Sequence, residues 1–161
     1  MNYSHNKKQI LNVVKTTFAK LKAPSIFIEG RRNRARMKTT YLLLNSRDEL
    51  LRIDTNKIVY LEADGNYTNI YTVNRLKGVV SINLSHMQQT LSETLKRQAS
   101  VFVRIGKKHI INHTYIYSIN VLKQKLTLSD GEKFTFTLDV SKEALKNLKN
   151  LYTSSLHNNI N

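Results

Sequence analysis

Three short segments carry the side chains best suited to chemistry, because each combines cationic, amide or hydroxyl groups with turn-forming residues. They are DGNYTN at 64–69, RIGKKHIIN at 104–112 and DVSK at 139–142. Amide and hydroxyl groups both donate and accept hydrogen bonds, and ammonium groups attract phosphate oxygens. These segments therefore favour recognition of a polyanion over the making or breaking of covalent bonds.

The first segment offers candidates for reading base edges or holding phosphate oxygens. Asn66, Thr68 and Asn69 each donate and accept hydrogen bonds, and Tyr67 lies among them. The same residues also suit an ordinary turn after Gly65, since Asn and Gly are common turn formers. Both interpretations stay open at this point.

The second segment places two adjacent lysines at a break in an apolar run. Gly106 interrupts the run, Lys107 and Lys108 follow it, and Arg104 precedes it. Such a pair of lysines at a strand corner is typical of phosphate contact. It is equally typical of an edge strand that is protected from pairing with another chain.

The third segment begins the last predicted helix. Free backbone amides at a helix N-terminus, together with Ser141 and Lys142, would bind a phosphate. The alternative is a simple N-cap made by Asp139 or Ser141.

No catalytic constellation is present in the sequence. The five glycines, at 30, 65, 78, 106 and 131, complete neither common nucleotide-binding loop. His109 and His113 are four residues apart in HIINH but lack the Glu of a zinc-protease helix, and Glu62 with Asp64 fits a strand end and a turn better than an acid–base pair. The chain has no cysteine. We predict no enzyme activity, cofactor, metal ion or small-molecule substrate.

The charge balance favours the same class of ligand. The 161 residues include 26 Lys and Arg against 11 Asp and Glu, for a formal net charge of +15 and a pI of about 10.1. Such a surface attracts nucleic acid most often and an anionic membrane or acidic protein less often. The absence of cysteine and of a long apolar run predicts a cytoplasmic location.

The elements that must position these segments are mostly strands. Alternating or short apolar runs predict ten strands, near 40–45, 50–53, 58–63, 67–73, 78–83, 101–105, 109–111, 115–121, 124–128 and 133–137. Two short amphipathic helices are predicted. One begins with Ser85 as its N-cap and runs to about residue 95, with Met87, Leu91 and Leu95 on one side, and the other covers 141–151. We therefore expect a mainly β domain with two helices.

Residues 1–38 differ from the rest of the chain. They contain ten Lys and Arg but only one acidic residue, Glu29. Apolar residues recur at helical spacing and predict a basic amphipathic helix over 7–22, namely Ile10, Val14, Phe18 and Leu21. This arm would bind phosphate, or pack on a partner, the main domain or a membrane surface.

Four blocks in this order resemble the LytTR (LytR/AlgR-type) family of DNA-binding domains of bacterial transcription regulators. They are KIVYLEADGNYTNIYTV (57–73), SINLSHMQQTLSETL (81–95), FVRIGKKHIINHTYIYSI (102–119) and LTLSDGEKFTFTLDVSKEALKNL (126–148). The resemblance predicts a domain over 39–152, between a basic arm at 1–38 and a polar tail at 153–161.

The resemblance implies an elongated ten-stranded fold whose loops enter successive major grooves of duplex DNA. It places Thr68 and Lys107 at base-contacting positions and a third contact near 138–142. It also implies promoter sites arranged as direct repeats and bound by a homodimer. Gly106 and Leu138 depart from the His and Arg that many members carry, so the target sequence cannot be taken from relatives. A phospho-acceptor domain common upstream in the family is not expected within residues 1–38, so control would come from dimerisation or an unidentified partner.

We therefore predict a sequence-specific DNA-binding transcription regulator. Its predicted contacts are Asn66, Tyr67, Thr68, Asn69, Arg104, Lys107, Lys108, Ser141 and Lys142. The alternatives are a nonspecific or RNA-directed basic module, and a regulator that docks on a partner or membrane through its N-terminal helix.

Overall fold

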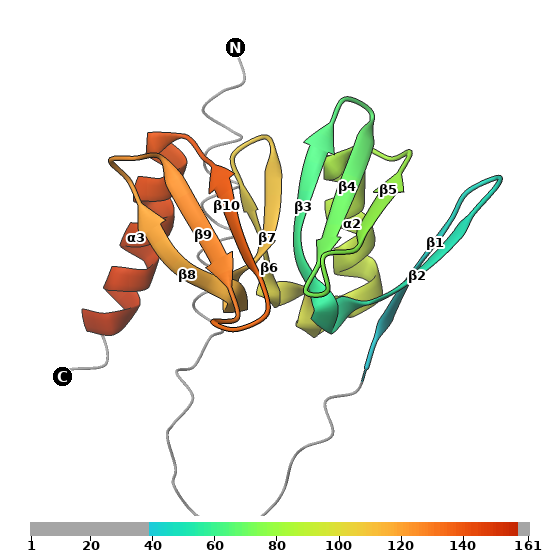
Figure 1. Cartoon of the computed structure of the whole chain (residues 1–161), viewed down its shortest axis with the longest axis horizontal. Coiled ribbons are helices and arrows are strands. Elements are labelled where there is room, and N and C mark those ends of the chain that lie inside the picture. Colours follow the sequence, from blue (N-terminus) through green and yellow to red (C-terminus); the bar gives the residue numbers. More distant parts are fainter. Residues whose placement is uncertain (1–38, 158–161) are drawn as a thin grey trace, which may run out of the picture.

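The computed structural model describes residues 39–157, which form ten strands in three antiparallel sheets and two α-helices (Figure 1). In chain order the strands and α-helices are β1 (Tyr41–Asn45), β2 (Leu50–Asp54), β3 (Ile58–Asp64), β4 (Tyr67–Thr72), β5 (Lys77–Val80), α2 (Leu84–Leu95), β6 (Phe102–Ile105), β7 (His109–Asn112), β8 (Ile116–Asn120), β9 (Lys125–Ser129), β10 (Thr135–Asp139) and α3 (Lys142–His157). Short 3-10 turns precede β3, β6 and β8, at Thr55–Lys57, Lys96–Val101 and His113–Tyr115.

The central sheet has five strands in the order β5-β4-β3-β7-β6. Its strands are short because turn residues interrupt each apolar run, and every neighbouring pair is antiparallel. One face packs against α2, whose residues Met87 and Leu91 are buried against Leu61 and Ile70 of the sheet. The spacing of Met87, Leu91 and Leu95 predicted this apolar side of the helix, and all three residues are buried.

The other face of the central sheet packs toward a three-stranded sheet of order β10-β9-β8 and toward α3. Leu145 and Leu148 of α3 are buried together with Leu126 and Leu128 of β9. Two hydrophobic clusters thus lie on opposite faces of one sheet, and adjacent isoleucines of β7 divide between them, Ile110 in one and Ile111 in the other.

The β1–β2 hairpin forms a separate two-stranded sheet at one end of the long axis, with α3 at the other end (Figure 1). Leu42 of the hairpin is buried in the α2 cluster, which attaches the hairpin to the domain. The arrangement is elongated because the sheets lie side by side rather than closing into a barrel (Figure 1).

The predicted mainly β class, the ten strands and the two helices in this part of the chain are confirmed. Three details differ from the prediction. The cap of α2 is Asn83, whose side chain accepts from the backbone amide of His86, rather than Ser85. β5 ends at Val80 rather than at residue 83, and α3 continues to His157. The helix predicted over 7–22 lies outside the described residues.

Candidate nucleic-acid interface

Four connections lie along one end of the strands, which we call the loop edge. They are the β3–β4 turn, the β6–β7 turn, the β8–β9 turn and the β10–α3 junction (Figure 1). Antiparallel pairing brings the ends of distant segments to the same edge, so all three segments singled out in the sequence meet there. The loop edge is the candidate interface.

The β3–β4 turn presents two of the predicted residues to solvent. Gly65 adopts a φ of +58°, a left-handed conformation that glycine adopts without strain. Asn66 follows it and is exposed, and Tyr67 is 52% exposed at the start of β4. An amide and a phenol are therefore available at the tip of this turn.

Thr68 and Asn69, which were predicted as contact residues, are buried, unlike Asn66 and Tyr67. Thr68 has no exposed surface, and its hydroxyl donates a 2.7 Å hydrogen bond to the carbonyl oxygen of Ile82. Asn69 is 5% exposed within β4. β3 and β5 pair with the two edges of β4, and both Thr68 and Asn69 are buried within the sheet, so neither side chain is accessible in this structure.

The β6–β7 turn presents Lys107 and Lys108, which are both exposed. Gly106 again has a φ of +58°, and the open space around it leaves the turn accessible. The backbone of this turn is joined to the central strand, because the amide of Ala63 donates to the carbonyl oxygen of Lys108 over 2.8 Å.

Arg104 stabilises this turn, because its guanidinium group donates hydrogen bonds to the backbone of the turn. Its Nε donates to the carbonyl oxygen of Gly106 at 3.1 Å, and its Nη2 donates to that of Lys107 at 2.9 Å. Nη1 donates to Oε1 of Gln88 on α2 at 3.4 Å. The guanidinium is therefore occupied in holding the lysine turn in shape, which is a supporting role.

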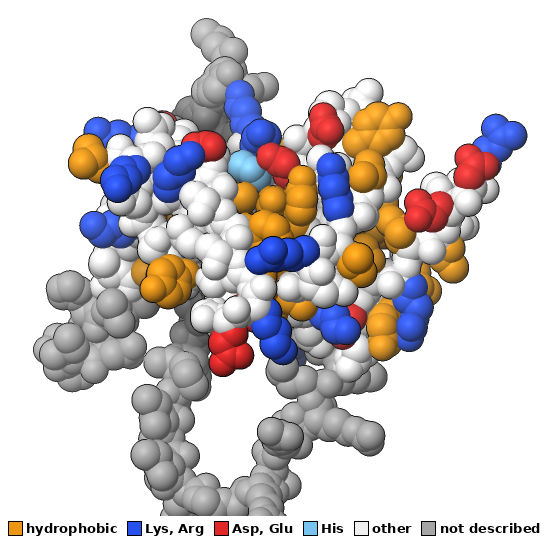
Figure 2. Space-filling model, in the orientation of Figure 1, with side chains coloured by type: hydrophobic (Ala, Val, Ile, Leu, Met, Phe, Trp, Pro, Cys, Tyr) orange, Lys and Arg blue, Asp and Glu red, His pale blue; other side chains and the backbone are white. Residues whose placement is uncertain are grey.

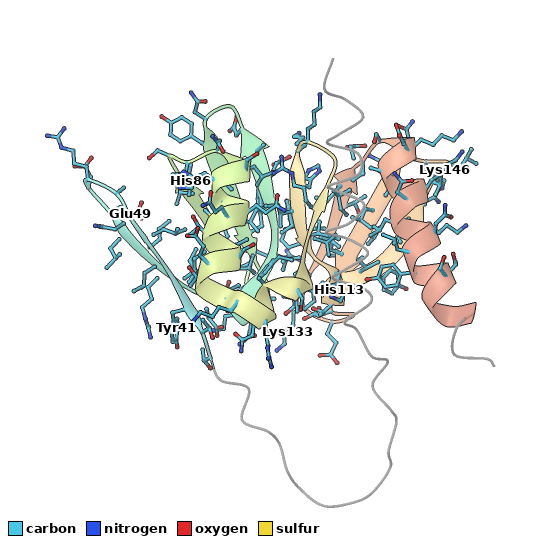
Figure 3. All side chains as sticks on the ribbon, turned by 180° about the vertical axis from the view of Figure 1, so that it is seen from behind. Tyr41, Glu49, His86, His113, Lys133 and Lys146 are labelled. Carbon is cyan, nitrogen blue, oxygen red and sulfur yellow. The ribbon has the colours of Figure 1, made fainter. Side chains whose placement is uncertain are left out.

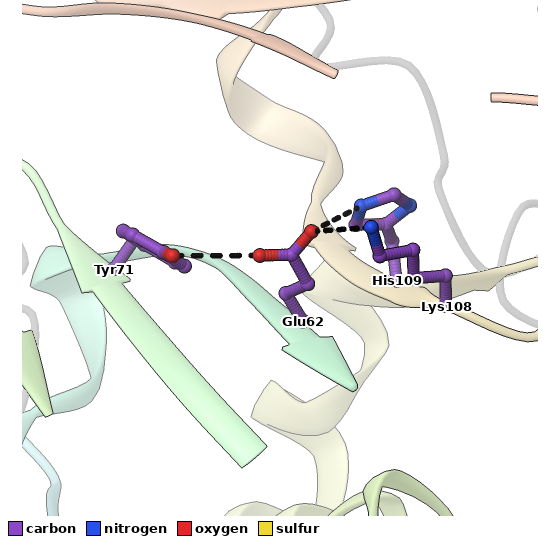
Figure 4. A network of polar contacts seen from close by, with 4 residues as sticks. All are labelled: Glu62, Tyr71, Lys108 and His109. Atoms are coloured by element: carbon purple, nitrogen blue, oxygen red, sulfur yellow. Dashed lines mark hydrogen bonds and ion pairs between the residues drawn. The ribbon is translucent and has the colours of Figure 1, made fainter. Parts of the chain in front are cut away.

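A polar network joins the lysine turn to β3 and β4 (Figure 4). Oε1 of Glu62 lies 3.1 Å from Nζ of Lys108 and 3.5 Å from Nε2 of His109, and Oε2 accepts from the Tyr71 hydroxyl at 3.4 Å. Burial opposes ionisation of Glu62, but the hydrogen bond and charge of Lys108, with help from His109, leave the pKa of Glu62 below its usual value. Glu62 in turn raises the pKa of Lys108, whereas burial lowers the pKa of His109.

The β10–α3 junction shows which of the two predicted residues, Asp139 or Ser141, caps α3. Ser141 Oγ accepts from the backbone amide of Ala144 at 3.3 Å, so Ser141 serves as the N-cap. Lys142 is exposed at the first position of α3. Asp139 instead forms an ion pair with Lys125 of β9, and this contact, followed by the charges of Lys108 and His109, lowers the pKa of Asp139.

The loop edge carries a concentration of lysines from several elements. They are Lys107, Lys108, Lys123, Lys125, Lys142 and Lys146. Figure 2 shows Lys and Arg side chains at the β6–β7 turn and around the end of the three-stranded sheet, with acidic side chains between them. Lys133 lies at the opposite end from Lys146 (Figure 3). A surface of this kind suits contact with successive phosphates.

Sequence reasoning missed the partners that hold the lysine turn, Glu62 and Gln88. The sequence pattern suggests Glu62 only as one half of a carboxyl pair with Asp64. The β3–β7 register, which pairs Glu62 with His109, would have revealed the contact, but no short-range pattern specifies that register.

The described residues include no group of three or more His, Asp or Glu side chains that could hold a metal ion. None of their helices is both long and apolar enough to span a membrane.

Comparison with known proteins identifies the family. The family model of the LytTr DNA-binding domain matches residues 48–153. The chain is also similar to the solved LytTr DNA-binding domain of a Bacillus cereus protein described as a methyl-accepting/DNA response regulator, with 21% identity, a TM-score of 0.49, and coverage of 70% of this chain and 96% of that domain. No curated protein matches the chain. Since the family model covers more than half of the sequence, the chain belongs to the LytTr family of DNA-binding domains, which are parts of transcription regulators rather than enzymes.

Proposed function

We propose that the chain regulates transcription by binding duplex DNA sequence-specifically, with turns of the loop edge inserted into successive major grooves. The observation that carries this proposal most directly is the construction of the β6–β7 turn. Lys107 and Lys108 are exposed at its tip, while Arg104 and the backbone of Ala63 fix its shape from inside the domain. A fixed cationic turn keeps its side chains oriented before DNA arrives, which reduces the entropic cost of binding.

The proposed contact residues are those of the predicted set that lie exposed at the loop edge. They are Asn66, Tyr67, Lys107, Lys108, Ser141 and Lys142. Asn66 supplies amide groups of the kind that read adenine edges, and the lysines supply phosphate contacts with access to guanine acceptors. Arg104 and Thr68 act by holding the turns in place.

The long loop edge also suits target sites that are repeated along one side of the duplex. Two copies of the chain bound to direct repeats would place their loop edges on the same face of DNA, one or two helical turns apart. We include binding of a homodimer to such repeats in the proposal.

The first test is selection of bound duplexes from a random DNA pool at about 150 mM salt, where weak nonspecific binding is largely suppressed. We expect a short motif, recovered as a repeat about one or two helical turns apart. Salt-sensitive binding without any motif would contradict sequence-specific recognition and would instead indicate a nonspecific basic module.

A pair of matched variants then tests the location of the interface. Lys107→Ala with Lys108→Ala should weaken binding and reduce the slope of log K against log salt by about 0.9 for each phosphate that is no longer neutralised, or about 1.8 in total. Lys57→Ala with Lys133→Ala removes the same charge from exposed positions at the other end of the strands. Lys57 directly precedes β3, and Lys133 lies in the β9–β10 turn, so this variant should leave the slope nearly unchanged. Equal effects of the two double variants would contradict the proposed interface.

A further inference from the structure

The β8–β9 turn, residues 121–124, is the part of the loop edge that the predicted contacts leave unused. Leu122 at its tip is 85% exposed, the largest exposure among the large hydrophobic side chains of the described residues. Single exposed leucines are common and need no explanation by themselves. The position of Leu122 is what distinguishes it, because Lys123 and Lys125 follow it directly in the chain at the end of the strands where the proposed DNA contacts lie (Figure 1).

The turn is held in a defined shape and joined to the neighbouring junction. The side chain of Asn120 accepts from the backbone amide of Lys123 at 2.9 Å, and Gln124 adopts a left-handed φ of 54°. The carbonyl oxygen of Gln124 accepts from the amide of Val140 at 3.1 Å. The turn therefore lies directly beside the junction that carries Ser141 and Lys142.

An exposed leucine next to an exposed lysine matches the chemistry of a DNA groove wall. The deoxyribose rings and the thymine methyl group are apolar, and the phosphates beside them are anionic. Polar side chains are the usual choice at a turn tip, so a leucine here gives the turn an apolar surface that a tip facing only water would not use.

We propose that the β8–β9 turn is an additional DNA contact, in which Leu122 packs against apolar atoms of the duplex and Lys123 binds a phosphate. This inference rests on the proposed function. It adds a contact from the three-stranded sheet to those made by the central sheet and α3.

Salt titration of DNA binding separates the apolar contribution of Leu122 from the electrostatic contribution of Lys123. Leu122→Ala should weaken binding by roughly three- to tenfold, the effect of removing part of a buried apolar side chain, with an unchanged salt slope because no counterion is involved. Lys123→Ala should weaken binding and lower the slope by about 0.9. Leu122→Met retains an apolar side chain of similar volume and should bind almost as the unchanged protein does.

The matched control is Leu76→Ala. Leu76 is 65% exposed in the β4–β5 turn, which lies at the opposite end of the strands from the β8–β9 turn (Figure 1). Its replacement should leave DNA affinity unchanged. Circular dichroism and thermal melting of each variant check that the fold is retained, as expected for changes at such exposed positions.

Replacement of thymine by uracil in the bound duplex shows whether Leu122 contacts a thymine methyl group or a deoxyribose ring. Loss of affinity for the uracil duplex by the unchanged protein, with no further loss for Leu122→Ala, would assign the contact to a thymine methyl group. Equal affinity of the unchanged protein for both duplexes, with weaker binding by Leu122→Ala to each, would assign it to deoxyribose. Either result supports the proposal.

The proposal is overturned if Leu122→Ala and Lys123→Ala both bind DNA as the unchanged protein does while the Lys107 and Lys108 double variant is weakened. In that case the proposed function stands and only the additional contact fails. If DNA selection yields no motif, the same titrations are made with a mixed-sequence duplex at low salt. Unchanged binding by Leu122→Ala and Lys123→Ala to that duplex would also overturn the additional contact.

Discussion

Lys108 and Glu62 form an ion pair with 3.1 Å between Nζ and Oε1, although Lys108 lies in the turn proposed to grip DNA. The lysine side chain is 64% exposed and the glutamate side chain 23% exposed, so the pair lies at the surface. A phosphate that binds Lys108 must therefore compete with a carboxylate of the same domain. Glu62 fixes the position of the lysine and at the same time reduces the positive potential around it.

Neutralising this carboxylate is expected to strengthen DNA binding. Glu62→Gln keeps the size of the side chain and its capacity to accept from Tyr71, but removes the negative charge. DNA affinity at about 0.1 M salt should rise by up to roughly fivefold, the effect of about 1 kcal/mol of screened attraction. Fluorescence anisotropy with a labelled duplex measures the change. Glu132→Gln in the β9–β10 turn is the control, and a decrease in affinity for Glu62→Gln would show that positioning of Lys108 outweighs repulsion.

Stability is expected to decrease as the pH falls from about 7.5 to 5.5. Burial lowers the pKa of His109 and also that of His113, so both resist protonation in the folded state. The unfolded chain binds these protons near the ordinary histidine pKa of about 6.5 and is favoured below it. The stability is therefore fully present above pH 6.5 and is lost as the pH falls below that value. Urea unfolding at several pH values measures how the free energy of unfolding depends on pH. This dependence should be weaker in His109→Gln, whereas the control variant His86→Gln, at an exposed position, should retain it.

Thr68→Val tests the structural role assigned to that hydroxyl. The replacement keeps the branched shape but leaves the carbonyl oxygen of Ile82 without the 2.7 Å hydrogen bond that Thr68 donates. The free energy of unfolding should fall by about 1–3 kcal/mol, the cost of leaving a buried polar group without its partner. DNA affinity of the folded protein should not change. A loss of affinity without a loss of stability would restore Thr68 to the set of contact residues.

Gly106→Ala should weaken both the fold and DNA binding. An alanine at a φ of +58° costs about 1–2 kcal/mol, so the turn would relax and move Lys107 and Lys108. Gly106→Asn should cost less, because asparagine tolerates this conformation better. Gly131→Ala provides the control, since Gly131 has a φ of +84° in the β9–β10 turn at the other end of the strands. It should lower the melting temperature while DNA affinity is retained.

Removal of residues 1–38 tests the contribution of the basic arm. This segment contains ten Lys and Arg and one Glu. Neutralisation of about five phosphates by the arm would add about 4.5 to the salt slope, and its removal should reduce the slope by that amount. An unchanged slope would exclude the arm from the interface. The DNA motif should remain the same, because specificity is assigned to the loop edge.

Local patterns in the sequence predicted the elements of this domain well. Strong turn residues such as Asp130 and Gly131 separate short apolar runs, so the order of ten strands and two helices could be predicted from the chain. The apolar spacing in α2 also identified its buried side. The end of β5 was predicted less well: the strand ends at Val80 because residues 81–83 already lead into α2, whose N-cap is Asn83.

The candidate site was predicted less completely. The three segments that meet at the loop edge were identified from residue types, but the exposure of each side chain was not. Thr68 and Asn69 follow a turn and look like surface residues, yet both faces of β4 are covered at that point. The contacts of Glu62 depend on pairing between β3 and β7, which are far apart along the chain. Such a long-range register cannot be deduced from local periodicity.

The division of neighbouring side chains between the two hydrophobic clusters has a consequence for how the domain unfolds. In β3, Ile58 and Leu61 belong to the cluster under α2, whereas Val59 and Tyr60 belong to the cluster under α3. One strand therefore forms part of both cores, so neither can be disrupted without exposing the other. We expect a single cooperative melting transition, and the turns at the loop edge should lose their shape together when it occurs.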